Sequence, residues 1–114
     1  MTLSHRAEAA APDEARGLLD ALFEASDQTL RWPIDRIEQW NALLDINTPE
    51  AHLAAAMMLR QEGSLWAVGS MEEGPFARYL WPGSNGSYVG NYAEAKAATP
   101  ALALLSAIAK GNGQ

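Results

Sequence analysis

Between residues 48 and 111 the spacing of the apolar residues changes from helical to strand-like and back, and this constrains the fold more than any other feature. The Thr-Pro pairs at 48–49 and 99–100 both mark helix starts, because a threonine hydroxyl caps free N–H groups and proline suits the first helical turn. The first of these helices is expected over 49–61. Residues 64–81 instead alternate with a period of two around a short glycine-containing turn, which predicts a β-hairpin.

Apolar residues at helical spacing predict two further helices upstream of this block. The first begins at Pro12, followed by Asp13 and Glu14, whose negative charges favour the N-terminal end of the helix dipole. The second begins at Pro33 and is expected to end near Asn47.

The expected sheet is small and antiparallel. Its hairpin strands cover 64–70 and 75–81, followed by a loop over the Pro- and Gly-rich stretch 82–87. Residues 88–92 offer a third strand, which Gly90 weakens. The fold class is therefore α+β, with a small antiparallel sheet (a β-hairpin with or without a third strand) packed by helices in the order α-α-α-β-β-(β)-α.

The length of 114 residues suits one domain, which we assign to residues 12–114. Residues 1–11 are Ala-rich and polar without periodicity, so we expect a flexible tail. The absence of cysteine excludes disulfides, thiolate metal sites and cysteine catalysis. There is no signal-peptide pattern, and the apolar stretch 97–109 is too short to cross a bilayer. We therefore expect a soluble cytoplasmic protein without membrane contacts.

The net charge of −6 is placed unevenly along the chain. Residues 1–62 hold eleven acidic and five basic side chains, whereas residues 63–114 hold three of each. Direct nucleic-acid binding is disfavoured, because it needs a Lys/Arg surface that displaces phosphate counterions. An acidic half can instead meet a basic surface on a partner protein, and the alternative is that the charge serves solubility alone.

The residue types that carry catalysis do not gather in any known pattern. His5 and His52 have no His/Asp/Glu companions at metal-ligand spacing, and we expect His52 to be a partly exposed surface residue. No G-x-S-x-G motif is present. The carboxylate pairs, such as Asp20 with Glu24, fit an exposed helix face better than a cleft. We predict no catalytic residue, no metal and no cofactor.

Aromatic residues are concentrated in the predicted sheet, where six fall between Trp66 and Tyr92. One interpretation places Trp66 and Phe76 in the core and the tyrosines at the sheet edge. The other predicts an exposed contact patch, because Tyr, Trp and Arg are enriched at binding hot spots. The candidate partner-binding residues are Arg78, Tyr79, Trp81, Tyr88 and Tyr92, with Glu72 and Glu73 at the hairpin turn.

The segments NTPEAHLAAAMMLRQEGSLWAV and AATPALALLSAIAKG, with the strand pair between them, resemble small phage and prophage proteins of the phage ABA-sandwich type. The resemblance covers residues 47–111 and rests on helix caps and core spacings. It implies a compact arrangement of α and β layers and an origin in a phage or prophage. It carries over no catalytic or binding residue.

These observations together predict a non-enzymatic accessory protein that binds another protein. Its most concrete form is a small acidic inhibitor of a bacterial defence system, of the anti-CRISPR kind, in the cytoplasm of the bacterial host. Its carboxylates would occupy the basic groove of a host nuclease complex where phosphates normally lie. The alternative is a structural module that forms a homodimer or larger homo-oligomer without inhibitory activity.

Overall fold

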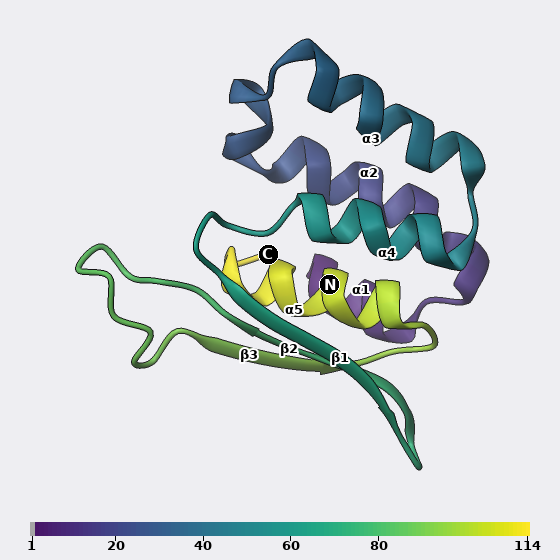
Figure 1. Ribbon diagram of the computed structural model, residues 1–114. Coiled ribbons are helices and arrows are strands. Elements are labelled where there is room, and N and C mark those ends of the chain that lie inside the picture. Colours follow the sequence, from purple (N-terminus) through teal and green to yellow (C-terminus); the bar gives the residue numbers. More distant parts are fainter. Residues whose placement is uncertain (1) are drawn as a thin grey trace.

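Helix α5 (Pro100–Gly111) occupies the centre of the molecule in the computed structural model, which describes residues 2–114 (Figure 1). Its start is the predicted one, because the hydroxyl oxygen of Thr99 accepts a hydrogen bond from the Leu102 amide at 3.1 Å. All residues from Ala101 to Ala109 are buried. A helix that is apolar all round must be covered on every side, and the rest of the chain supplies that cover.

The sheet contains three antiparallel strands in the order β1-β2-β3, which confirms the predicted α+β class. Strands β1 (Leu65–Met71) and β2 (Gly74–Leu80) form the hairpin, with Val68 opposite Ala77. Strand β3 (Tyr92–Lys96) pairs with β2, with Ala93 opposite Tyr79.

The third strand lies beyond the range 88–92 predicted for it. Residues 88–91 form a turn instead, in which the Asn91 amide donates to the Tyr88 carbonyl at 3.0 Å. Gly90 has a φ of 79°, a left-handed conformation that does not fit a strand. The glycine therefore turns the chain, and pairing with β2 begins only at Tyr92, opposite Leu80.

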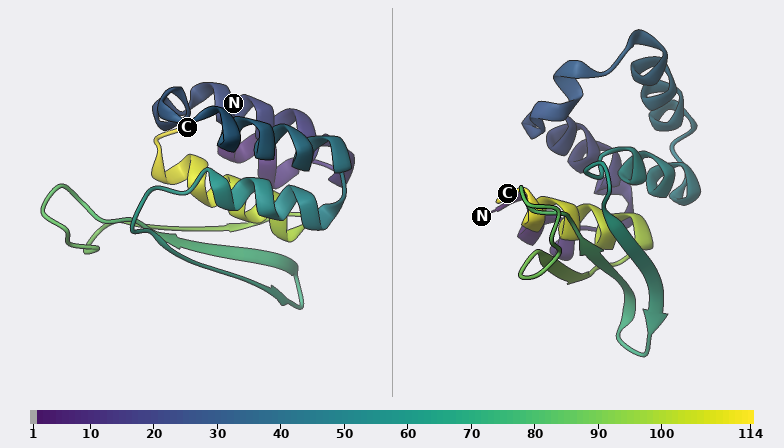
Figure 2. Two further views of the ribbon diagram at one scale, coloured as in Figure 1. Left: turned by 45° about the horizontal axis from the view of Figure 1, so that its top comes forward. Right: turned by 60° about the vertical axis from the view of Figure 1, so that its left-hand side comes forward.

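The helices lie on one side of the sheet, and α5 packs directly against it (Figures 1 and 2). Helices α1 (Leu3–Ala9) and α4 (Pro49–Met58) flank α5, and α2 (Ala15–Ala25) contacts all three of these helices. Helix α3 (Ile34–Ile46) is outermost and rests on α4. Helix α4 begins at the predicted Thr48 cap and ends at Met58, short of the expected 61.

Residues 1–11 were expected to be a flexible tail, and the structure corrects this for residues 3–9, which form α1. The Thr2 hydroxyl oxygen caps the helix by accepting from the His5 amide at 3.2 Å. Ser106 of α5 donates its hydroxyl to the Ser4 carbonyl at 2.9 Å, and Ala7 is fully buried. The contact is made by small side chains, so the sequence shows no large apolar stripe that would predict it.

An aromatic cluster that the sequence analysis did not single out joins the outer helices. The rings of Phe23 in α2, Trp40 in α3 and Trp32 just before α3 have centroids 5.1 to 6.0 Å apart. Trp32 follows η2, a 3₁₀ helix over Asp27–Arg31 that connects α2 to α3. Offset and edge-to-face contacts of this kind stabilise a structure beyond the apolar area they bury. The cluster therefore holds α3 to the helices beneath it.

We predict that Leu105→Ala lowers the free energy of unfolding by about 2–5 kcal/mol, because it removes a fully buried side chain from α5 and leaves a cavity. Leu30→Ala is the matched control, because Leu30 is 87% exposed, and it should change stability by less than about 0.5 kcal/mol. Urea denaturation of both variants measures the difference. Equal effects would contradict the central position of α5.

Candidate functional site

The sheet has one face covered by α5 and one face with no helix over it. The covered side chains include Ala77, Tyr79, Ala93 and Ala95, all of them buried. Because side chains alternate along a strand, the strand register brings the others together on the opposite face. We call this the open face: Leu65, Ala67, Gly69 and Met71 of β1, Phe76, Arg78 and Leu80 of β2, and Tyr92, Glu94 and Lys96 of β3.

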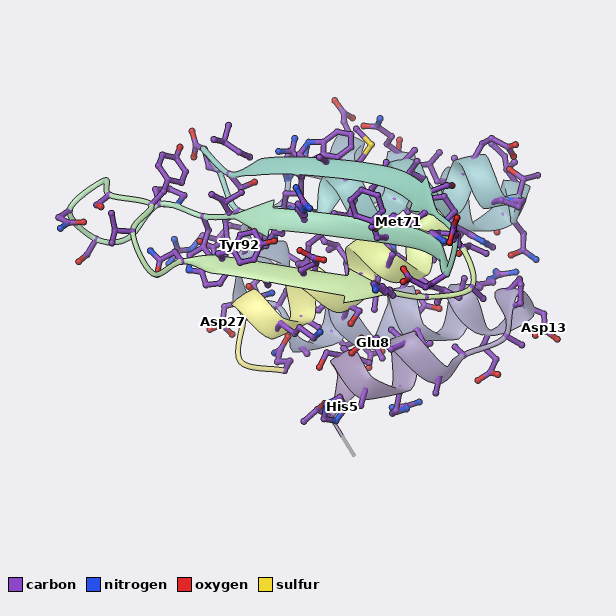
Figure 3. All side chains as sticks on the ribbon, turned by 90° about the horizontal axis from the view of Figure 1, so that it is seen from below. His5, Glu8, Asp13, Asp27, Met71 and Tyr92 are labelled. Atoms are coloured by element: carbon purple, nitrogen blue, oxygen red, sulfur yellow. The ribbon has the colours of Figure 1, made fainter. Side chains whose placement is uncertain are left out.

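Figure 3 looks onto the open face, with the three strands in front of the helices and with Met71 and Tyr92 labelled at opposite ends. Leu65, Met71 and Tyr92 are each about half exposed, at 55%, 48% and 50%. Large apolar side chains at this exposure lose water when another surface covers them. The face therefore carries large apolar side chains that are available for contact.

Phe76 lies across the open face because of the residue opposite it. Its partner in the register is Gly69, and a Cβ at that position would come within 2.8 Å of the Phe76 ring. The ring thus packs over the bare backbone of β1. The Arg78 guanidinium lies 5.5 Å from the centroid of the same ring. Glycine at 69 is required for this flat packing.

The charged groups of the open face are paired with one another. Arg78 and Glu94 are opposite each other in the register, with Arg78 Nε 3.4 Å from Glu94 Oε2. Tyr92 also donates its hydroxyl to Glu94. This hydrogen bond, followed by the attraction of Arg78, lowers the pKa of Glu94, so the carboxylate stays ionised. Lys96 Nζ reaches Glu73 of the hairpin turn at 3.2 Å.

The structure brings only part of the predicted contact patch together. Arg78 and Tyr92 lie on the open face, and Glu72 and Glu73 lie exposed at the adjoining hairpin turn. Tyr88 lies in the loop after β2, where its hydroxyl donates to the Gly63 carbonyl at 2.6 Å. Two further candidates, Tyr79 and Trp81, stack on each other with ring centroids 5.6 Å apart, on the side toward α5.

Tyr79 was predicted to be an exposed contact residue, and the structure corrects this, because its side chain is completely buried. Its hydroxyl oxygen accepts a hydrogen bond from the Gln61 amide at 2.9 Å. Burial raises the pKa of the hydroxyl, so it remains protonated. The alternation of side chains along β2 correctly places Tyr79 and Arg78 on opposite faces of the sheet. The sequence alone does not say which of the two faces the helices cover.

His52 was predicted to be partly exposed, and this prediction is also wrong. The side chain is 7% exposed, and its Nε2 lies 2.7 Å from Oδ1 of Asn47. It lines a small cavity of about 270 Å³ together with Pro12, Asp13 and Thr99. Burial, and after it the positive charge of Arg16, lowers the pKa of His52. The imidazole therefore stays neutral at pH 7 and serves the packing between helices.

Residues 2–114 contain no group of three or more histidine, aspartate or glutamate side chains arranged to hold a metal ion. Nor does this part of the chain contain a helix with the length and apolar character that crossing a bilayer requires. Comparison with models of protein families, with curated proteins and with solved structures finds no match to this chain. The resemblance to phage ABA-sandwich proteins remains a prediction.

The lowered pKa of His52 predicts a pH dependence of stability. The unfolded chain takes up a proton near pH 6.5, whereas the folded protein does so only at lower pH. The stabilisation is complete above pH 6.5 and is lost as the pH falls, at most about 1.4 kcal/mol per pH unit. Urea denaturation of wild type and His52→Gln between pH 7.5 and 5 should show a steeper loss for wild type. The same change of unfolding free energy with pH in both proteins would contradict a lowered pKa of His52.

Proposed function

We propose that the chain is a non-enzymatic protein-binding module whose open face binds a second copy of itself. The observation that carries the proposal is the group of large apolar side chains on the face of the sheet that no helix covers. The covered face of β2 and β3 presents Tyr79 and the alanines at 77, 93 and 95 to α5, and the open face still presents Phe76, Leu80 and Tyr92. A sheet face that leaves several large apolar side chains uncovered is typical of an interaction surface.

The charges of the open face favour binding to a second copy over binding to a partner whose surface carries charges of a single sign. Arg78 and Lys96 of the open face pair with Glu94 and with Glu73 of the adjoining hairpin turn, so the charges of these two ion pairs cancel within a protein of net charge −6. An isologous interface places the same patch on both subunits and must be complementary to itself. A mixed and internally paired set of charges meets this condition, and covering it leaves no charge without a partner.

The acidic residues support the same arrangement. Residues 12–50, which form η1 (Pro12–Glu14), α2, η2, α3 and the start of α4, hold nine acidic and three basic side chains and thus account for the whole net charge of −6. These elements lie on the helical side of the sheet (Figure 1). Two copies that meet through their open faces keep these acidic regions apart, which limits the repulsion between them. The two sheets then pack about 10 Å apart, as in a β-sandwich.

We predict that wild-type protein sediments as a concentration-dependent dimer of its 12.3-kDa chain, and that Leu65→Arg shifts it to monomer. The substitution adds a third positive charge to the open face, where Arg78 and Lys96 already have carboxylate partners, so that two copies would bury it unpaired. Leu30→Arg is the matched control, because Leu30 is exposed on η2, away from the sheet, and should leave the dimer intact. A wild-type chain that is monomeric at every concentration in analytical ultracentrifugation contradicts the proposal.

A second candidate function rests on the acidic region itself. Its carboxylates fit a basic surface that normally receives phosphates, as on a nuclease complex of a bacterial defence system, and a phage or prophage inhibitor would act in this way. Dimerisation through the open face would leave this region accessible on both copies.

For this candidate we predict salt-sensitive capture of a defence nuclease complex by the wild-type chain. Neutralising the exposed side chains Asp20, Glu24 and Asp27 to their amides should weaken capture, because long-range attraction falls with acidic charge. Glu72→Gln with Glu73→Gln is the control, since this pair lies at the hairpin turn. Binding that does not change with salt concentration, or an equal loss of capture in both variants, would rule out the idea that these carboxylates take the place of phosphates.

A further inference from the structure

A groove of about 430 Å³ lies where the outer helices meet the C-terminal end of α4, at a site separate from the open face. Trp32 and Arg36 line it from one side, and Arg60, Gln61 and Glu62 line it from the other. We call it the arginine groove. Its volume is within the range of about 300–1,000 Å³ that is usual for small-molecule sites.

Arg36 is fixed in the arginine groove by contacts on two sides. Its Nη2 donates to the carbonyl of Met58 at 2.9 Å, across the boundary between α3 and α4. Its guanidinium carbon lies 4.5 Å from the centroid of the Trp32 ring, which is a cation–π contact. The side chain is half-buried, so its remaining N–H groups have a defined direction.

Arg60 is held in a comparable way. Its Nε donates to the Met57 carbonyl at 3.2 Å, and its Nη1 donates to the carbonyl and the hydroxyl of Ser64 at 3.3 and 3.2 Å. Its guanidinium carbon lies 5.5 Å from the Trp66 ring centroid. The guanidinium groups of Arg36 and Arg60 are thus preorganised by backbone carbonyls rather than by carboxylates.

Capping the last carbonyls of α4 is a structural role for both arginines, because positive charge is favourable at a helix C-terminus. That structural role does not use all the N–H donors of the two guanidinium groups. A guanidinium has five N–H donors, and neither arginine has a carboxylate within 4.0 Å anywhere in residues 2–114. Nη2 of Arg60, and Nε and Nη1 of Arg36, have no hydrogen-bond acceptor in this part of the chain.

We propose that the arginine groove binds a small monocarboxylate. The spare guanidinium donors suit a planar carboxylate, which accepts two parallel N–H bonds. Met57 and Trp32 provide apolar contact for the rest of the ligand, and the side-chain carboxamide of Gln61 provides a polar one. Glu62 also lines the groove and repels ligands that carry several negative charges. The site therefore selects a single anionic group on a small, partly apolar body.

The proposal is tested by titrating the full chain with benzoate and following its amide and indole resonances by NMR. We expect saturable shifts at Gln61, Glu62 and Gly63 and at the Trp32 indole, and none with benzamide, the neutral analogue. Inorganic phosphate should bind more weakly than benzoate. Shifts that do not saturate, equal shifts with benzamide, or tighter binding of phosphate would each overturn the assignment.

Substitutions separate the groove from general charge effects. Arg36→Gln and Arg60→Gln should each weaken benzoate binding about tenfold or more, because each removes charge-assisted hydrogen bonds. Arg31→Gln is the matched control, since Arg31 is exposed on η2 and does not line the groove. Should a glutamine variant unfold, Arg60→Lys keeps the charge but loses the planar fork, and it should still weaken binding. Unchanged affinity in the folded variants, or equal loss in Arg31→Gln, would contradict the site.

Discussion

The burial of helix α5 is the constraint from which the arrangement of the other elements follows. Its residues 101–109 are all buried, so the chain must cover the helix on every side. The sheet covers one side, and α1, α4 and α2 cover the others. The sheet uses one face for this contact, and the remaining helix, α3, packs on α4 rather than on the sheet. The open face is thus left uncovered because all the helices gather on the side of α5.

The large apolar side chains on the uncovered face of the sheet are the basis for the proposed interface. Tyr79 and the alanines at 77, 93 and 95 face α5, whereas Phe76, Leu80 and Tyr92 remain on the uncovered side. Burial of apolar area is the main favourable term in association. Because residues 12–50 on the helical side account for the net charge, the open face, whose charges are ion-paired, can meet its own copy while these acidic regions stay apart.

Local signals in the sequence predicted local structure well. The Thr48 and Thr99 caps and the period-two hairpin are all present, because each depends on residues close together in the chain. Features set by distant contacts were missed: α1 packs through small residues, and Tyr79 and His52 are buried by helices far away in sequence. For the same reason the sequence placed Arg78 and Tyr92 in a contact patch but could not indicate that Leu65 and Met71 share the uncovered face with them.

The central claim is that the open faces of two copies meet, and isotope-filtered NMR on a mixture of labelled and unlabelled chains tests it most directly. The account predicts intermolecular contacts between the methyl groups of Leu65 or Met71 and the rings of Phe76 or Tyr92 on the other copy. Intermolecular contacts confined to the helical side or to the outer edges of β1 and β3, or none at all at dimer concentrations, would contradict it.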